Sequence, residues 1–477
     1  MSANQTLPEG LAELGRVHFV GVGGVGMSAV ARVMVARGVP VSGSDAKDLP
    51  VMADLAALGA RIAVGYAAEN VGDADTVVRG SAIRPDNPEL VQAAARGLKV
   101  LHRSEALAAA MAGNRVIAVA GTHGKTTTTS MTTWMLRGAG LDPSFAIGAN
   151  VPALGVNAAA GETDIFVAEA DESDESFLNY RPLTEVITNV EADHLDHYGT
   201  AEAVHAAFDA FAALVPEQGL VLACADDPGA RALADRIRDR DGAPRVLTYG
   251  TAEDADVHVR FDPAGSEVVW DGRTYALPLH VPGLHNALNA AGAFAAAVDA
   301  GADPERAAAS LADFAGAARR FELKGEAGGV RVFDDYAHHP TEVRAALAAA
   351  RAVAGGHGVH VLFQPHLFSR TREFAAEFAQ ALTAADTVRV MDIYPAREDP
   401  IPGVTSELVT AHLARGAYAP SVERAVTEIA GAARPGDIVL TVGAGDVTFQ
   451  GAQILAELGA RSGATAGGTD PGAPHGA

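Results

Sequence analysis

The segment VIAVAGTHGKTT, residues Val116 to Thr127, joins an apolar run to a short glycine loop that ends in a lysine and two threonines. The apolar run predicts a buried strand from Val116 to Ala120, and the residues that follow Lys125 predict a helix through Leu136. In such a strand–loop–helix, backbone N–H groups surround a nucleoside triphosphate, the lysine neutralises its β- and γ-oxygens, and a threonine hydroxyl binds Mg²⁺. The loop is two residues shorter than the usual phosphate-binding pattern.

Lysine is scarce in this chain, because only Lys47, Lys99, Lys125 and Lys324 occur among 36 basic residues. A lysine inside a phosphate-binding pattern is therefore improbable as an accident. We predict that Lys125 contacts the phosphates and takes part in catalysis.

Length and composition limit the possible architectures and functions. A chain of 477 residues with 48% apolar side chains exceeds what one core needs and predicts several domains. The net charge of −23 excludes general nucleic-acid binding. No apolar run approaches the roughly 18 residues of a membrane span, and the N-terminus lacks a signal-peptide pattern, so we expect a cytoplasmic protein without a membrane partner. Cys224 is the only cysteine, which excludes an internal disulfide and a cysteine-based zinc site.

Short apolar runs alternate with longer segments of helical period, which predicts α/β domains with parallel sheets. We predict three domains over residues 1–112, 113–319 and 320–460, and a disordered tail over 461–477, where the chain is rich in Gly and Ala. Alternating residues between about Val257 and Leu277, broken by Asp271-Gly272, predict an antiparallel hairpin. Other predicted strands lie at Val17–Val20, Val39–Ser42, Thr76–Val78, Ile165–Ala168, Val186–Asn189, Leu220–Ala223, Val330–Phe333, Val359–Phe363, Val388–Met391 and Ile438–Val442.

A second glycine-rich loop, GVGGVG from Gly21 to Gly26, follows the first predicted strand and opens a predicted helix. Glycines there let the backbone approach a pyrophosphate at the helix N-terminus. Asp45 ends the next strand, where dinucleotide-binding folds place a ribose-binding acid. The pattern alone leaves NAD, FAD and a UDP-sugar as alternatives.

Two acidic segments follow predicted strands of the second domain: EADESD begins at Glu169, and NVEADHLD contains His194. Crowded carboxylates repel one another unless a cation lies between them, and Mg²⁺ prefers oxygen ligands beside phosphate. Both segments are predicted to lie at strand ends that follow a phosphate loop, and this placement favours a Mg²⁺ site. A zinc site at His194 and His197 is poorly supported, because the spacing is short and no cysteine contributes.

Further polar groups gather later in the chain. His285 and Asn289 are one helical turn apart in PGLHNALN, a spacing that would let both contact a nucleotide. DDYAHHP and QPHLFSRT both follow predicted strands of the third domain. Their histidines and arginine could hold carboxylate and phosphate groups.

Taken together, these segments resemble the Mur ligases of peptidoglycan synthesis across nearly the whole chain. The matching pieces are VGVGGVGMSAVA, GSD, SAIRPDNPE, AGTHGKTTTT, EADESDESFL, NVEADHLDHY, PGLHNALNAAGA, RRFELKGE, DDYAHHPTE, FQPHLFSRT, DIYPAREDPIPGV and TVGAGDV. The resemblance implies an N-terminal Rossmann-like domain that binds a UDP-sugar, a central P-loop ATPase-type domain and a C-terminal Rossmann-like domain. It also implies ATP and Mg²⁺ as cofactors.

The family likeness assigns roles residue by residue. Catalytic roles would fall to Lys125, His194 and His338. The Mg²⁺ ligands would be Thr126, Glu169 and His194. ATP would be bound by Gly121, Thr122, His123, Gly124, Lys125, Thr126, Thr127, His285, Asn289, Arg320 and Asp335. The substrate would be bound by Gly23, Val25, Gly26, Asp45, Ser81, Tyr336, His338, His366 and Arg370. Leu367 stands where many family members have an arginine, so one anion contact is expected to be missing.

Within the family, the sequence is most similar to the member that adds L-alanine to the lactyl carboxylate of UDP-N-acetylmuramate through an acyl phosphate. Several other members use a carbamylated lysine in the central domain, and this chain has no lysine between Lys125 and Lys324. EADESD also favours the alanine-adding member over the relative that attaches recycled tripeptide. Two other classes stay open as alternatives: a nicotinamide-dependent oxidoreductase that uses Gly21–Gly26, and a nucleotide sensor without turnover.

Overall fold

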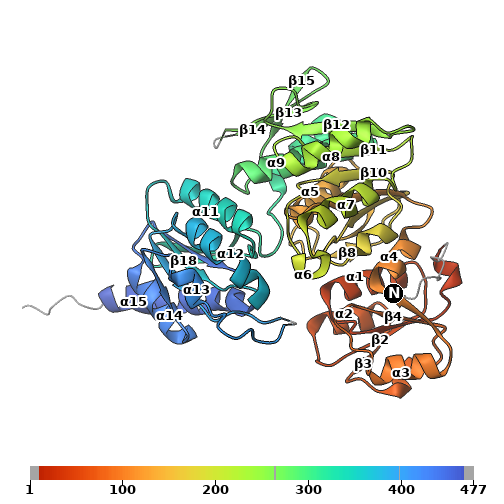
Figure 1. Ribbon diagram of the computed structural model, residues 1–477, viewed down its shortest axis with the longest axis horizontal. Coiled ribbons are helices and arrows are strands. Elements are labelled where there is room, and N and C mark those ends of the chain that lie inside the picture. The colour runs from red at the N-terminus through yellow and green to blue at the C-terminus, as the bar shows by residue number, and fades with distance from the viewer. Residues whose placement is uncertain (1–9, 263–264, 397, 467–477) are drawn as a thin grey trace, which may run out of the picture. The chain divides into compact units, whose positions relative to one another are not determined.

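The computed structural model describes residues 10–262, 265–396 and 398–466. They form three sheets, shown in Figure 1. The described residues up to 280, with 284–317, make one compact unit that holds two of the sheets, and residues 281–283 with those from 318 onward make a second unit that holds the third. The predicted α/β class is confirmed, and the three sheets fall within the three predicted domain ranges.

The first sheet is parallel, with strand order β3-β2-β1-β4-β5. Its strands are β1 Val17–Val20, β2 Val41–Asp45, β3 Arg61–Val64, β4 Thr76–Arg79 and β5 Lys99–His102, and its helices are α1 Val25–Ala36, α2 Pro50–Ala57, α3 Pro88–Ala95 and α4 Arg103–Met111. The sequence did not predict β3 and β5, because neither has the continuous buried pattern of β1. The sheet order nevertheless puts β1, with its glycine loop, at the centre.

The second sheet has ten strands in the order β15-β14-β13-β12-β11-β10-β6-β9-β7-β8. Its strands are β6 Arg115–Ala120, β7 Ser144–Ala146, β8 Ala158–Ala159, β9 Ile165–Glu169, β10 Thr184–Ile187, β11 Leu220–Cys224, β12 Arg245–Gly250, β13 Val257–Arg260, β14 Ser266–Trp270 and β15 Arg273–Leu277. Its helices are α5 Lys125–Gly138, α6 Leu195–Tyr198, α7 Ala201–Ala212, α8 Pro228–Arg238, α9 Leu284–Asp299 and α10 Pro304–Ser310. Strands β10, β6 and β9 are parallel neighbours, so the loops that follow them meet at one edge.

The predicted hairpin is confirmed as β14 and β15. Asp271 and Gly272 have φ values of +48° and +71°, the backbone of a type I′ turn, which matches the twist of paired strands. Strand β13 adds a third antiparallel partner beside β14.

Helix α5 is rich in threonine, which has a low propensity for helix interiors. Its threonine side chains are almost entirely buried, so their hydroxyl groups need hydrogen-bond partners. Hydroxyls of Thr129, Ser130, Thr132 and Thr133 each donate to the carbonyl four residues earlier. These four buried hydroxyls therefore have acceptors within the helix, which removes much of the cost of burying them, whereas Thr128 Oγ1 is buried without a hydrogen-bond partner among the described residues.

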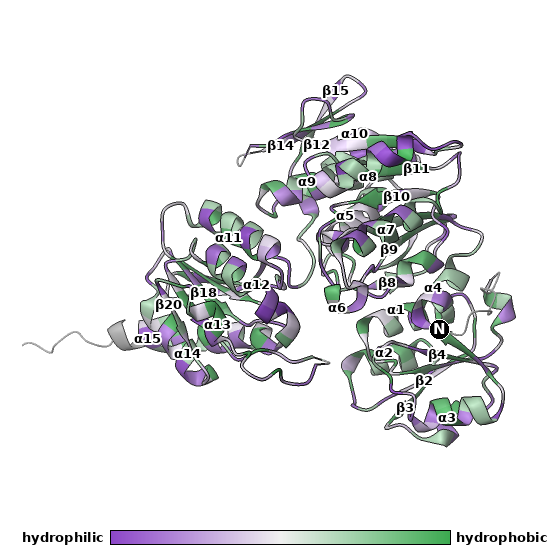
Figure 2. Cartoon of the chain, viewed as in Figure 1, coloured by the Kyte–Doolittle hydropathy of each residue, from purple (hydrophilic) through white to green (hydrophobic). Residues whose placement is uncertain are grey.

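The second unit holds a six-stranded sheet in the order β16-β17-β21-β18-β19-β20. Its strands are β16 Glu322–Ala327, β17 Val330–Asp335, β18 Val359–Phe363, β19 Thr387–Val390, β20 Gly416–Tyr418 and β21 Ile438–Val442, and its helices are α11 Pro340–Ala354, α12 Phe368–Leu382, α13 Glu407–Thr410, α14 Val422–Ala432 and α15 Gln450–Ala466. Strand β16 pairs antiparallel with β17, and every other pair is parallel. In Figure 2, α11 carries both hydrophilic and hydrophobic residues, as an amphipathic helix on a sheet should.

The predicted disordered tail begins too early. Helix α15 continues to Ala466, so the prediction is wrong for residues 461–466, and residues 467–477 lie outside the described part of the chain. Arg461 extends the helix by pairing with Glu457 one turn earlier, at 2.9 Å between Nε and Oε1, and alanine favours helix.

No helix among the described residues is long and apolar enough to cross a membrane.

Glu185 on β10 is fully buried, and within the described residues neither of its carboxylate oxygens has a hydrogen-bond partner. Burial raises the pKa of Glu185 well above its ordinary value, and Arg240 opposes this shift only in part. The folded protein therefore keeps a proton on Glu185 that the unfolded chain releases.

The substitution Glu185→Gln tests this feature. Because the unfolded chain binds fewer protons, the wild-type free energy of unfolding should fall by about 1.4 kcal/mol per pH unit above roughly pH 5, until the folded pKa is passed. Glu185→Gln should lose this pH dependence, measured by urea unfolding from pH 5 to 9. Glu202→Gln, at an exposed position on α7, is the control and should keep it. Parallel curves for wild type and Glu185→Gln would contradict the prediction.

Candidate active site

The loop between β6 and α5 depends on two glycines. Gly121 and Gly124 have φ values of +137° and +82°, which L side chains rarely adopt. A Cβ on Gly121 would lie 2.0 Å from Thr188 Oγ1, and a Cβ on Gly124 would lie 2.7 Å from Asn289 Oδ1. The predicted phosphate loop therefore has a backbone that only glycine permits, with α5 starting directly after it at Lys125.

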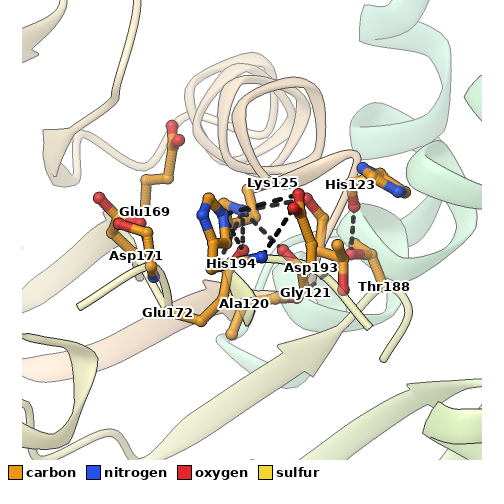
Figure 3. Close-up of polar contacts among 12 residues, drawn as sticks. Ala120, Gly121, His123, Lys125, Glu169, Asp171, Glu172, Thr188, Asp193 and His194 are labelled. Carbon is orange, nitrogen blue, oxygen red and sulfur yellow. Dashed lines mark hydrogen bonds and ion pairs between the residues drawn. The ribbon is translucent and has the colours of Figure 1, made fainter. Parts of the chain in front are cut away.

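Lys125 lies at the centre of the candidate site, as Figure 3 shows. Its Nζ donates to the carbonyl oxygens of Gly121 at 2.7 Å and Thr122 at 3.2 Å, and it pairs with Glu172 Oε2 at 2.7 Å. Burial by itself lowers the pKa of Lys125, but the carboxylates of Glu172, Asp171 and Glu169 outweigh burial, so the pKa is raised. The ammonium group stays charged in the loop where a phosphate would lie.

The first acidic segment turns toward this lysine. Burial raises the pKa of Glu172 to about 7, although Lys125 lowers it, and the Glu172 side chain is only 2% exposed. Burial also raises the pKa of Asp171, but the positive charges of Lys125 and Arg103 outweigh burial and lower it overall. The sequence placed Glu172 in an acidic cluster without predicting that it pairs with Lys125.

Two predicted Mg²⁺ ligands are brought together. Thr126 Oγ1 donates to Glu169 Oε1 at 3.0 Å, and the backbone N–H of Gly148 donates to Glu169 Oε2 at 2.7 Å. A hydroxyl beside a carboxylate at the start of a phosphate-binding helix is a donor set that suits Mg²⁺. The third predicted ligand, His194, has a φ of +54° and places Nε2 3.7 Å from Glu172 Oε1.

The second acidic segment also supports the loop. Asn189 Oδ1 accepts from the backbone N–H of His123 at 2.7 Å, and the Asn189 carbonyl accepts from the N–H of Thr122 at 3.2 Å. The Thr188 hydroxyl donates to the His123 carbonyl. The residues after β10 therefore hold the phosphate loop, a role that the sequence did not predict.

Helix α9 brings the predicted pair His285 and Asn289 to this region. Both lie on α9, one turn apart, and the buried Asn289 side chain lies against Gly124. Asn289 is thus placed beside the phosphate loop, as its predicted nucleotide contact requires.

The glycine loop of the first sheet is held by the end of β2. The Ser44 carbonyl accepts from the N–H groups of Gly21 and Val22, both at 2.8 Å, and Asp45 Oδ2 accepts from the N–H of Gly23 at 3.0 Å. Asp45 therefore positions the loop, and its contact with a ribose stays a prediction. Helix α1 starts at Val25, where the sequence places the diphosphate.

Two groups connect this loop region to the acidic segment. The Ser81 hydroxyl donates to Asp174 Oδ2 at 2.7 Å. Arg103, at the first position of α4, lies 3.7 Å from Asp171 Oδ2 through Nη2. Sequence reasoning missed Arg103, because HRSEAL resembles an ordinary capped helix start.

In the second unit, Asp335 and Arg320, which were both predicted to meet the nucleotide, lie near each other. The Asp335 carboxylate accepts from the N–H groups of Phe321 at 2.9 Å and Ala337 at 2.8 Å. Burial raises the pKa of Asp335 to about 6, although the charge of Arg320 lowers it. The Arg320 guanidinium lies 5.3 Å from the centre of the Tyr336 ring.

An aromatic row extends from Tyr336. Its ring centre is 5.2 Å from that of His338, which is 5.8 Å from that of His366. His366 stacks on Tyr394 with centres 5.8 Å apart, and Tyr394 is a neighbour that the sequence analysis did not assign.

Arg370 and Leu367 follow His366 at the start of α12. The Arg370 side chain is largely buried. Leu367, the departure from the family pattern, is also buried and has a φ of +69°. Leu367 therefore places an apolar side chain next to His366, where the family pattern would place an arginine that contacts an anion.

Comparison with known proteins identifies three consecutive matches to family models. The Mur ligase family catalytic domain matches residues 16–115, the Mur ligase middle domain matches residues 119–297, and the Mur ligase glutamate ligase domain matches residues 319–445. Together they span most of the chain.

Curated relatives and a solved structure match nearly full length. The chain is 70% identical to a UDP-N-acetylmuramate–L-alanine ligase of Paenarthrobacter aurescens, over 94% of this chain and 98% of that protein. It is 68% identical to the protein of the same name from Arthrobacter sp., over 96% and 98%. The crystal structure of UDP-N-acetylmuramate-alanine ligase from Thermotoga maritima matches with a TM-score of 0.76 at 28% identity, covering 94% of this chain and 99% of that one.

The substitution Gly124→Ala tests whether the loop binds a nucleotide. The new Cβ would press on Asn289 Oδ1, so ATP affinity measured by calorimetry should fall more than about tenfold, and the positive φ should cost about 1 kcal/mol of stability. Gly155→Ala is a matched control, because Gly155 has a φ of +73° and open space around its Cβ position. It should lose similar stability and keep ATP affinity. Equal ATP affinity in both variants would contradict the prediction.

Proposed function

The chain belongs to the Mur ligase family, and we propose that it joins L-alanine to the lactyl carboxylate of UDP-N-acetylmuramate in an ATP-dependent reaction of peptidoglycan precursor synthesis. The observation that carries this proposal is 70% identity over 94% of the chain to a protein named for that reaction. The family and the three-domain α/β fold expected from the sequence are confirmed. The exact domain boundaries stay predictions.

The chemistry requires negative charge to be neutralised. ATP transfers its γ-phosphoryl group to the lactyl carboxylate, and the amine of L-alanine then attacks the acyl phosphate and releases phosphate. Phosphoryl transfer depends on positioning and on cations that face the developing charge. The Lys125 ammonium supplies one such cation from within the phosphate loop.

Thr126, Glu169 and His194 would hold Mg²⁺. When bound, the ion would neutralise negative charge on the phosphate oxygens and so favour transfer of the phosphoryl group. The hydrogen bond between Thr126 and Glu169 supports this assignment, because a hydroxyl and a carboxylate oxygen already lie within ligand reach of each other.

The second unit would bind the alanine part of the product through Tyr336, His338, His366 and Arg370. The Tyr336 carbonyl and Glu342 orient the His338 ring, at 3.0 Å and 3.2 Å from Nδ1. Arg320 and Asp335 would meet the nucleotide. Because ATP and UDP-sugars are cytoplasmic metabolites, the proposed reaction places the enzyme in the cytoplasm.

Phosphate release tests the ligase reaction directly. Release from ATP should require both UDP-N-acetylmuramate and L-alanine, and Lys125→Ala should reduce it by about 10²-fold or more. Lys99→Ala is a control, because Lys99 lies on β5 outside the proposed site. ATP hydrolysis at the same rate without the two substrates would exclude the ligase, and ATP binding without turnover would favour a sensor. Turnover of a nicotinamide cofactor would favour the oxidoreductase.

Acceptor choice separates two members of the same family. The solved murein peptide ligase of Psychrobacter arcticus matches this chain with a TM-score of 0.69 at 26% identity, so the fold by itself does not choose between them. The chain should use free L-alanine at a kcat/KM at least about 10²-fold above that of a tripeptide acceptor, because its pocket is expected to reject the larger group. A preference for tripeptide, measured by product formation with each acceptor, would overturn the assignment.

A further inference from the structure

Helix α1 follows the first strand of the first sheet, but it also packs against the second sheet. It contacts α4 on its own side and the edge strands β7 and β8 of the second sheet. Seven of its twelve residues are buried, more than the single apolar stripe of a helix that covers one sheet and faces solvent. The position of α1 is therefore set by both sheets.

Two polar side chains hold α1 at its opposite ends. At the first turn, the buried side chain of Asn157 donates from Nδ2 to the Val25 carbonyl at 2.9 Å. Just beyond the last turn, Arg37 donates to Ser144 Oγ at 3.0 Å and to the Ala110 carbonyl. At 1.5 Å per residue these ends are roughly 18 Å apart. Each contact therefore fixes a different end of the helix.

Asn157 also begins a chain of hydrogen bonds that reaches two predicted Mg²⁺ ligands. Its carbonyl accepts from the N–H of Ile147 at 2.9 Å, and the next N–H, of Gly148, donates to Glu169 Oε2 at 2.7 Å. Glu169 Oε1 accepts from the Thr126 hydroxyl at 3.0 Å. A Cβ on residue 148 would lie 2.6 Å from Glu169 Oε1, so this approach requires glycine. The contacts therefore connect the first turn of α1 to the first turn of α5.

We propose that Asn157 is a positioning residue for phosphoryl transfer, which fixes the first turn of α1 relative to Glu169 and Thr126. The inference rests on the proposed function, in which a carboxylate of one substrate attacks a phosphate of another. The reacting atoms must lie about 3–3.5 Å apart, and a displacement of roughly 1 Å can cost about 10²-fold in rate. The Asn157 amide is buried against a protein carbonyl, so its loss should change the rate of the reaction and leave substrate affinity intact.

The substitution Asn157→Leu tests the proposal, because it removes the donor and keeps a side chain of similar size. The Val25 carbonyl would still accept from the Ser28 hydroxyl at 3.0 Å, so the variant should fold. Its kcat, measured by phosphate release, should fall about ten- to one-hundred-fold. The Kd values of ATP and of UDP-N-acetylmuramate, each measured alone by calorimetry, should stay within about twofold of wild type.

Hydrogen exchange supplies a measurement that needs no substrate or metal ion. In the free protein, amides in a peptide that covers Ile147 and Gly148 should exchange at least about threefold faster in Asn157→Leu than in wild type, because the segment has lost its anchor to α1. Unchanged exchange would contradict the proposed link.

Gly148→Ala breaks the same chain at its other end. The new Cβ would press on the Glu169 carboxylate and should lower kcat as well. If the two residues act through one chain, the double variant should lose less activity than the product of the two single losses. A loss equal to that product would contradict the proposal.

Two further variants control for a general loosening between the sheets. Arg37→Ala releases the far end of α1 and should lower the melting temperature at least as much as Asn157→Leu, with less than about a threefold change in kcat. Asn179→Leu is matched in chemistry, because Asn179 Nδ2 donates to Ser104 Oγ at 2.8 Å, from the segment after β9 to α4. It should keep the wild-type kcat, since its contact is not part of the chain to Glu169.

Three results would overturn the inference. An unchanged kcat in Asn157→Leu would exclude a positioning role. A weakened Kd for UDP-N-acetylmuramate would make Asn157 a binding residue instead. An equal loss of kcat in Arg37→Ala and Asn179→Leu would assign the effect to general loosening. Wild-type phosphate release that does not depend on L-alanine would refute the proposed function, whereas the exchange measurement would still test the link, so the two proposals fail separately.

Discussion

One ion pair, between Lys125 and Glu172, holds the phosphate loop against the first acidic segment. Both groups are nearly buried, and an unpaired buried charge costs several kcal/mol. Lys125 also donates to two loop carbonyls, so the pair fixes the loop as well as the charge. A phosphate bound in this loop would compete with Glu172 for the Lys125 ammonium group.

The sheet order explains why these groups meet. Strands β10, β6 and β9 are adjacent and parallel, so the loops after them emerge at the same edge. The loop after β6 carries Lys125, the end of β9 carries Glu169, and the residues after β10 include Asn189, which holds the loop backbone. The loop after β6 contacts both of the other segments, through Asn189 and Glu169. The positive charge of Lys125 offsets the repulsion between the carboxylates that gather at this edge of the sheet.

The sequence could predict much of this arrangement because it depends on local pattern. An apolar run followed by glycine, lysine and threonine at fixed spacing is compatible with few structures other than a phosphate loop. The longer buried strands could be predicted because each has a continuous apolar run. Half-exposed strands such as β3 and β16 carry no comparable pattern. The disordered tail was predicted from residue 461 because composition suggested disorder, whereas the pairing of Arg461 with Glu457 supports the last turns of α15. The positions of Arg103 beside Asp171 and of Tyr394 beside His366 were missed because they depend on contacts between segments far apart in sequence.

The net charge of −23 gains a physical meaning from these contacts. An acidic protein that binds anionic substrates must concentrate positive charge at a few side chains. In this protein each of these side chains lies beside a carboxylate. Lys125 faces Glu172, Arg103 faces Asp171, and Arg320 lies near Asp335. These carboxylates keep each cation in place when no substrate is bound, and their repulsion of an incoming anion is lowered when Mg²⁺ accompanies it. Each cation is therefore held by a carboxylate partner until an anionic substrate competes for it.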